Sequence, residues 1–173
     1  MSTTPSPRNR VITRQVVEWA AWDWGSAAFN AVATTFVFTT YLTSDGVFTD
    51  AGTASSWLSN GMTIAGLFIA LLAPITGQRA DRRGRGGVWL GWFTGLVVAC
   101  MLAMYFVHPE SVLGPKGALM LGIVLLGLGN VFFEFASVNY NAMLNHLGEK
   151  EDRGKISGFG WASGYIGGIV LLL

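Results

Sequence analysis

Charged side chains are scarce in this 173-residue chain: Asp, Glu, Lys and Arg make up 12% of it, about half the roughly 25% usual in soluble domains. The 11 basic and 10 acidic residues nearly cancel, so nothing in the net charge of +1 favours a nucleic-acid partner. The single cysteine, Cys100, excludes a disulfide framework within the chain. The sequence also lacks a secretory signal peptide and a phosphate-binding loop ending in Gly-Lys-Ser/Thr. We therefore expect no metal and no nucleotide or other cofactor.

Hydrophobic residues, in contrast, make up 51% of the chain, and five apolar stretches carry only two charges, Asp23 and Glu134. A helix of about 20 apolar residues crosses a hydrocarbon core roughly 30 Å thick, at a rise of about 1.5 Å per residue. The sequence therefore predicts an all-α fold, a polytopic bundle of membrane helices. The spans are expected at residues 19–42, 57–77, 88–107, 117–138 and 156–173.

Basic residues predict the orientation of this bundle. Ten of the eleven basic residues lie in three places: before the first span, between the second and third spans, and between the fourth and fifth spans. Since Lys and Arg concentrate in cytoplasmic loops, we predict a multi-pass plasma-membrane protein whose N-terminus is inside the cell. Trp19 and Trp22 are then expected in the cytoplasmic interfacial belt. Residues 1–14 are predicted to be a disordered cytoplasmic tail, and residues 15–173 a transmembrane unit.

Polar residues recur along two of the predicted spans. A carboxylate inside a span is costly and needs a partner, a wet cavity or a proton. Helical spacing keeps each set of polar residues on one stripe, and two facing stripes would line an aqueous path for solute and protons. The alternative is that these groups hold helices together through hydrogen bonds. The stripes are Asp23, Ser26, Asn30 and Thr34 on the first span, and Asn130, Glu134, Ser137 and Asn141 on the fourth.

Glycines form a third pattern. Gly160, Gly164 and Gly168 recur every four residues in the fifth span and leave one side of that helix smooth. Small residues at this spacing let helix backbones approach closely in membranes. Static close packing and a sliding contact are both compatible with the pattern.

The stretch between the second and third spans carries a motif. Its arginines suit any cytoplasmic loop, but that reading does not explain Gly77, Asp81 and Gly84. The pattern Gly77-x-x-x-Asp81-Arg82-x-Gly84-Arg85 resembles the signature loop between helices two and three of the major facilitator superfamily. Gly86 stands where that signature usually has a second basic residue.

Five further segments carry a second resemblance: residues 21–30, 133–134, 140–144, 157–161 and 164–168. Together they resemble one branch of that superfamily, the vacuole effluxers, which include autophagy-related amino-acid exporters of fungi and their bacterial relatives. The resemblance implies twelve helices in two six-helix halves, with about five helices of the first half present here. It also implies that helices one and four line the central cavity and that Asp81 and the loop arginines form a charge clasp. The chain ends within an apolar run, so we expect a truncated sequence whose C-terminal half is missing.

These features favour a secondary transporter of a small polar solute that works by alternating access and is coupled to protons. Amino acids as the solute, and efflux as the direction, follow from the resemblance alone. One alternative is a membrane enzyme that uses the intramembrane carboxylates; another is a helical subunit that does not transport. No nucleophile–base pair or metal-ligand cluster is visible in the sequence, so we expect that the protein is not an enzyme.

Overall fold

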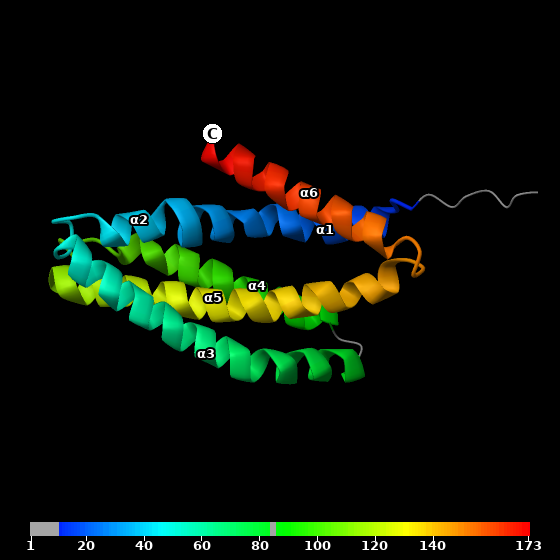
Figure 1. Cartoon of the computed structure of the whole chain (residues 1–173), viewed down its shortest axis with the longest axis horizontal. Helices are drawn as coiled ribbons and strands as arrows, with labels where there is room; N and C mark the ends of the chain where they lie inside the picture. The colour runs from blue at the N-terminus through cyan, green and yellow to red at the C-terminus, as the bar shows by residue number, and fades with distance from the viewer. Residues whose placement is uncertain (1–10, 84–85) are drawn as a thin grey trace, which may run out of the picture.

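The structure is a computed structural model that describes residues 11–83 and 86–173, with side chains described outside residues 76–85. Every regular element in this part of the chain is a helix, and the helices lie roughly side by side in an elongated bundle (Figure 1). This confirms the predicted all-α fold. The elements are α1 (Arg14–Ala27), η1 (Ala28–Phe36), α2 (Phe38–Thr43), α3 (Ala51–Arg83), α4 (Gly86–Ala103), η2 (Met104–Phe106), α5 (Gly114–Leu147) and α6 (Arg153–Leu172).

The first predicted span is divided into three helical pieces. Thr13 caps α1 by accepting a hydrogen bond from the Val16 amide at 3.4 Å. The middle piece, η1, is a nine-residue π-helix, a wide form that is rare and often found at functional sites. The hydroxyls of Thr34 and Thr35 donate to carbonyls five residues back, at 3.2 and 2.7 Å. These bonds match the wide turns of η1, so two adjacent threonines support a conformation that hydropathy does not reveal.

Three helices of the described chain are long and apolar enough to cross a membrane: Ala51–Ile75 of α3, Gly86–Phe106, and Gly114–Leu147. They correspond to predicted spans two, three and four. The helices run past the predicted ends of the second and fourth spans because hydropathy marks only the apolar part of a helix. Spans one and five correspond to α1–η1–α2 and to α6, and their place in the membrane stays a prediction.

Helix α5 lies at the centre of the packing and contacts α3 and α4, whereas α6 packs mainly against α1 (Figure 1). A core of buried residues that includes Phe29, Leu42 and Leu126 joins η1 and α2 to α5. Glycines on α5 allow this closeness: a Cβ atom added at Gly129 would lie 2.8 Å from the Phe29 ring. The first span is thereby held against α5, its partner in the predicted cavity.

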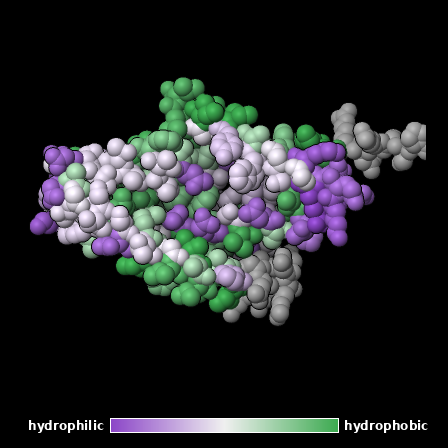
Figure 2. Space-filling model, viewed as in Figure 1, coloured by the Kyte–Doolittle hydropathy of each residue, from purple (hydrophilic) through white to green (hydrophobic). Residues whose placement is uncertain are grey.

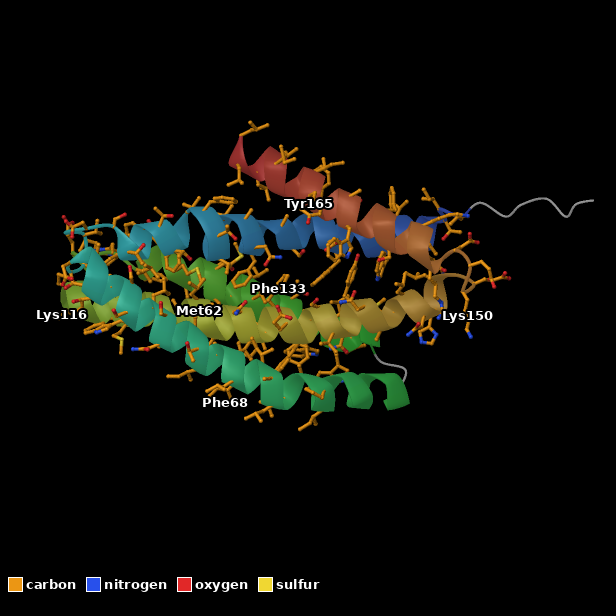
Figure 3. The ribbon with its side chains drawn as sticks, viewed as in Figure 1. Met62, Phe68, Lys116, Phe133, Lys150 and Tyr165 are labelled. Carbon is orange, nitrogen blue, oxygen red and sulfur yellow. The ribbon has the colours of Figure 1, made fainter. Side chains whose placement is uncertain are left out.

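The outer surface is apolar where a soluble protein would be polar. Leu71 on α3 is 71% exposed and Trp92 on α4 is 68% exposed. Apolar side chains cover the upper and lower margins of the middle of the bundle, pale and hydrophilic ones lie between them, and hydrophilic ones also gather at its two ends (Figure 2). Phe68 projects from the outer side of α3, and Lys116 and Lys150 lie at opposite ends of the bundle (Figure 3). This distribution suits a bundle surrounded by lipid along its middle.

Two of the sequence-based predictions fall on parts that the structure does not describe. Residues 1–10 of the predicted tail lie outside the described residues, as do Gly84 and Arg85 of the signature loop. The backbone of residues 77–83, which include Gly77, Asp81 and Arg82, continues α3, so the helix runs into the expected loop. The side chains of these residues are also outside the described set, and the charge clasp stays a prediction.

Candidate functional site

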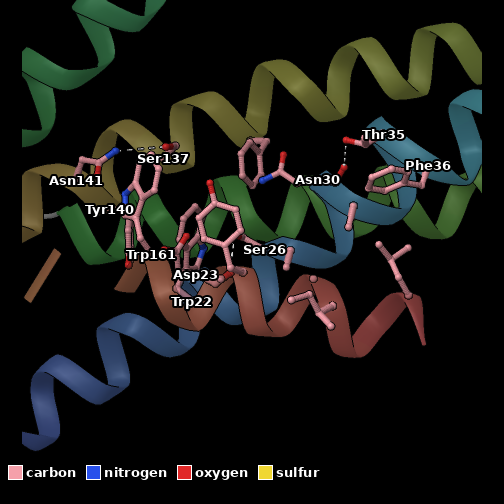
Figure 4. A pocket seen from close by; sticks show the side chains of 18 residues that line it. Trp22, Asp23, Ser26, Asn30, Thr35, Phe36, Ser137, Tyr140, Asn141 and Trp161 are labelled. Atoms are coloured by element: carbon pink, nitrogen blue, oxygen red, sulfur yellow. Dashed lines mark hydrogen bonds between the residues drawn. The ribbon is translucent and has the colours of Figure 1, made fainter. Parts of the chain in front are cut away.

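A cavity of about 630 Å³ lies among α1, η1, α5 and α6 (Figure 4). Trp22, Asp23, Tyr140 and Trp161 gather at one end of it, and Asn30 lies toward the other. The walls are mainly aromatic and aliphatic, with a few polar groups among them, which is typical of sites for small molecules.

The cavity brings together polar residues from both predicted stripes. Asp23, Ser26 and Asn30 line it from the first span, and Ser137 and Asn141 line it from α5. The Ser26 hydroxyl donates to the backbone carbonyl of Asp23 at 2.9 Å, and the Asn141 amide donates to the Ser137 hydroxyl at 3.4 Å. Asn30 and Asn141 are exposed and can offer amide groups to a solute.

Asn130 and Glu134, the other two predicted pathway residues on α5, are not among the residues that line this cavity. The lining residues Phe133 and Ser137 are four positions apart and define the face of α5 that is turned toward it. Successive residues of an α-helix are rotated by about 100°, so Glu134 points well to one side of Phe133. Glu134 is half-buried, and no hydrogen bond or ion pair to it occurs within the described chain.

Asp23 is the carboxylate among the described residues that line the cavity. Within the described residues its carboxylate has no ion pair and accepts no hydrogen bond, and no Lys or Arg lines the cavity. Its carboxyl carbon lies 3.3 Å from the position that a Cβ atom of Gly164 would occupy. Helix α6 therefore packs directly against the carboxylate, which keeps an open side toward the cavity.

The predicted glycine face of α6 is turned toward α1. A Cβ atom at Gly160 would lie 2.7 Å from the Trp19 ring, and one at Gly167 would lie 2.7 Å from the Trp24 carbonyl oxygen. At Gly168 it would meet only ordinary contacts, at 3.8 Å or more. Because an α-helix has 3.6 residues per turn, a strict four-residue repeat rotates away from a neighbouring helix. The closest backbone contact at this end belongs to Gly167, which the repeat did not include.

A column of packed aromatic rings joins α1 and η1 to α5, and the sequence analysis missed it. Trp19 stacks on Tyr140 with ring centroids 4.2 Å apart, and Tyr140 lies 4.5 Å from Trp22. Trp22 is followed by Phe133 at 5.8 Å and Phe133 by Phe29 at 5.4 Å. Trp19 is buried in this column, 6% exposed, so its expected place in an interfacial belt is wrong.

Hydrogen bonds hold the column in place. The Trp19 indole nitrogen donates to the Tyr140 carbonyl at 3.0 Å, and the Trp22 indole nitrogen donates to the Thr94 hydroxyl of α4 at 2.9 Å. The buried Tyr140 hydroxyl has no hydrogen-bond partner among the described residues. Helical spacing of Trp19, Trp22 and Phe29 is the signal that could have indicated a buried face.

Metal chemistry has no visible basis in the described part of the chain. No three His, Cys, Asp or Glu side chains come together there in a way that could hold a metal ion. The arrangement instead combines one carboxylate, amide and hydroxyl groups, and aromatic rings around a space of small-molecule size. Such groups can bind a solute without reacting with it.

Comparisons with known proteins agree with this picture. The family model of the Major Facilitator Superfamily matches residues 2–172. The chain is 30% identical over 160 residues to a protein of Bacillus subtilis (strain 168) described as "Uncharacterized MFS-type transporter YxiO"; the match covers 91% of this chain and 36% of the relative. The chain thus spans about a third of that relative's length, and no solved structure matches it. With its membrane-length apolar helices and this match along nearly its whole length, the chain is that of an integral membrane protein and belongs to the Major Facilitator Superfamily.

Proposed function

We propose that the protein containing this chain is a secondary transporter that moves a small polar solute through the cavity between α1–η1, α5 and α6. The observation that carries the proposal is the cavity itself: it holds about 630 Å³, and polar groups from two predicted spans line it. Superfamily membership and the likeness to an MFS-type transporter support the same function. Transport would proceed by alternating access, in which two halves of the protein rock around the site.

The solute, the direction of transport and the coupling to protons are proposed from the resemblance to the vacuole effluxers and from the two intramembrane carboxylates. That resemblance favours amino acids as the solute and efflux across the plasma membrane, with the N-terminus inside. Asp23 and Glu134 are proposed to carry the coupled protons, since an intramembrane acid can gain and lose a proton as its surroundings change. The loop around Asp81 is proposed to steady one state of alternating access. The glycine face of α6 is proposed to permit the sliding of helices between the states.

The proposal is tested by uptake of radiolabelled amino acids into proteoliposomes that contain the full-length protein under an imposed pH gradient. Ala31 lines the cavity, so Ala31→Phe should fill part of it and lower the uptake rate severalfold. Ala70 is exposed on α3 and does not line the cavity, so Ala70→Phe adds the same bulk elsewhere and should leave uptake unchanged.

The possible results separate the parts of the proposal. Equal uptake by the Ala31→Phe and Ala70→Phe variants would show that the solute does not pass through this cavity. Absence of amino-acid uptake above empty liposomes would contradict the solute class. If Asp23→Asn and Glu134→Gln both left the dependence on the pH gradient intact, the proton pathway would be wrong.

A further inference from the structure

The carboxylate of Asp23 has no countercharge in the described chain. It lies at a cavity wall, no ion pair reaches it, and the lining includes no Lys or Arg. A carboxylate in a predicted membrane span is costly unless a cation, a proton or water compensates it. The space in front of Asp23 therefore favours a positively charged group over a neutral or negative one.

The aromatic rings around Asp23 fall into two sets. Tyr140 stacks on Trp19, lies tilted against Trp22 and is 3% exposed, so its ring is largely covered. Trp161 and Tyr165 on α6, in contrast, are 62% and 67% exposed and line the cavity. Their centroids are 6.3 Å apart, so the two rings are neighbours that a single group could contact.

The close packing of α6 on α1 places these open rings near the carboxylate. Gly164 of α6 faces Asp23 closely: a Cβ atom added at Gly164 would lie 3.3 Å from the carboxyl carbon of Asp23 and 3.4 Å from one of its carboxyl oxygens. Trp161 precedes Gly164 by three residues and Tyr165 follows it directly, so both start from the same turn of helix. Figure 4 shows Trp161 and Asp23 at the same end of the cavity.

We propose that the transported solute carries a cationic nitrogen, an ammonium group, that binds between the Asp23 carboxylate and the rings of Trp161 and Tyr165. This inference rests on the proposed transport function and specifies its substrate class. The carboxylate supplies the ion pair, and the electron-rich ring faces attract the cation from the other side. A solute with only a carboxylate finds no basic side chain among the residues that line this cavity.

Two probes with one carbon skeleton test the inference directly. Isopentylammonium carries the cation, and isopentyl alcohol replaces it with a neutral hydroxyl. Binding of each to the full-length protein in lipid nanodiscs is measured by isothermal titration calorimetry, with empty nanodiscs as the partition control. We expect the ammonium probe to bind at least tenfold more tightly than the alcohol.

Variants then assign the preference to the proposed residues. Asp23→Asn should reduce the ratio between the two probes to less than twofold, whereas Glu110→Gln, which removes one acid from the exposed outer loop, should leave it unchanged. Trp161→Leu should lower the affinity for the ammonium probe about two- to fivefold. This is the range expected from the loss of an exposed cation–π contact of roughly 0.5–1 kcal/mol. The effect on the alcohol should be smaller.

Equal affinities of the two probes for the unmodified protein, or no binding of isopentylammonium, would overturn the inference even if Asp23→Asn did not fold. A preference that survives in Asp23→Asn would overturn it as well. Because binding is measured without transport, protein that binds the cation but shows no uptake would contradict the proposed function alone. Uptake of a solute through the cavity without any cation preference would contradict this inference alone.

Discussion

The contact between α6 and α1 makes a quantitative prediction at two adjacent glycines. A Cβ atom at Gly167 would lie 2.7 Å from the backbone oxygen of Trp24 and 3.2 Å from its Cα atom, so a helix must shift to admit it. At Gly168 the added atom would only touch the Cβ atoms of Ala27 and Ala31, at 3.8 and 3.9 Å. Gly167→Ala should therefore be destabilising, and Gly168→Ala should not.

The magnitude follows from two opposing effects. Replacing Gly by Ala within a helix stabilises it by about 1 kcal/mol, and this gain is shared by both variants. Forcing an extra methyl group into close packing costs about 1–3 kcal/mol, and only Gly167→Ala incurs that cost. The difference between the two variants thus isolates the clash, and we expect Gly167→Ala to be less stable than Gly168→Ala by about 1–3 kcal/mol.

Equilibrium unfolding of the full-length protein by SDS in mixed micelles, followed by circular dichroism, measures both free energies. The pair needs no further control for helix propensity, since the variants are neighbours in α6 and introduce the same side chain. If the free energy of unfolding of Gly167→Ala equalled or exceeded that of Gly168→Ala, the contact between the backbones of α6 and α1 would not exist in the folded protein.

Two further predictions concern single hydrogen bonds. A double-mutant cycle with Trp22→Phe and Thr94→Val should give a coupling energy of about 0.6 kcal/mol, and at most about 1.7, the range for interhelical bonds in membranes; a value of zero in the unfolding assay would mean that the bond between α1 and α4 is not formed. The hydrogen bond from the Thr53 amide to the Asp50 carboxylate, 2.8 Å long, holds the pKa of Asp50 below its ordinary value. Its contribution to stability is therefore present above the ordinary pKa of about 3.9 and is lost as the pH falls through the lower folded value. The midpoint of SDS unfolding of Asp50→Asn should consequently depend less on pH between 6 and 3 than that of the unmodified protein, and parallel profiles would contradict this.

Much of the architecture could be predicted because it depends on properties that add up along the chain. Apolar runs interrupted by few charges require helices in lipid, where every backbone group must find its partner within the segment. The comparisons confirm the superfamily that the pattern from Gly77 to Arg85 indicated, although that pattern falls where side chains are not described. The vacuole-effluxer branch stays a prediction.

The candidate site was predictable only in part. Helical spacing placed Asp23, Ser26 and Asn30 on one side of the first span, and these three residues line the cavity together. The same reasoning grouped Glu134 with Ser137, yet Ser137 lines the cavity and Glu134 does not. Periodicity gives the relative directions in which side chains leave one helix. The positions of the neighbouring helices decide which side of that helix faces a cavity.

The sequence alone determined that this chain is helical, that it is built for a membrane, and that a carboxylate lies within an apolar segment. Composition and the order of apolar runs suffice for these conclusions, because the transfer of side chains into lipid is nearly independent of their neighbours. The tertiary structure alone decided that Gly167 meets α1, that the Tyr140 ring stacks on Trp19 and that it lies tilted against Trp22. Such contacts join residues far apart in the chain, and they depend on helix rotation and crossing that no local pattern contains.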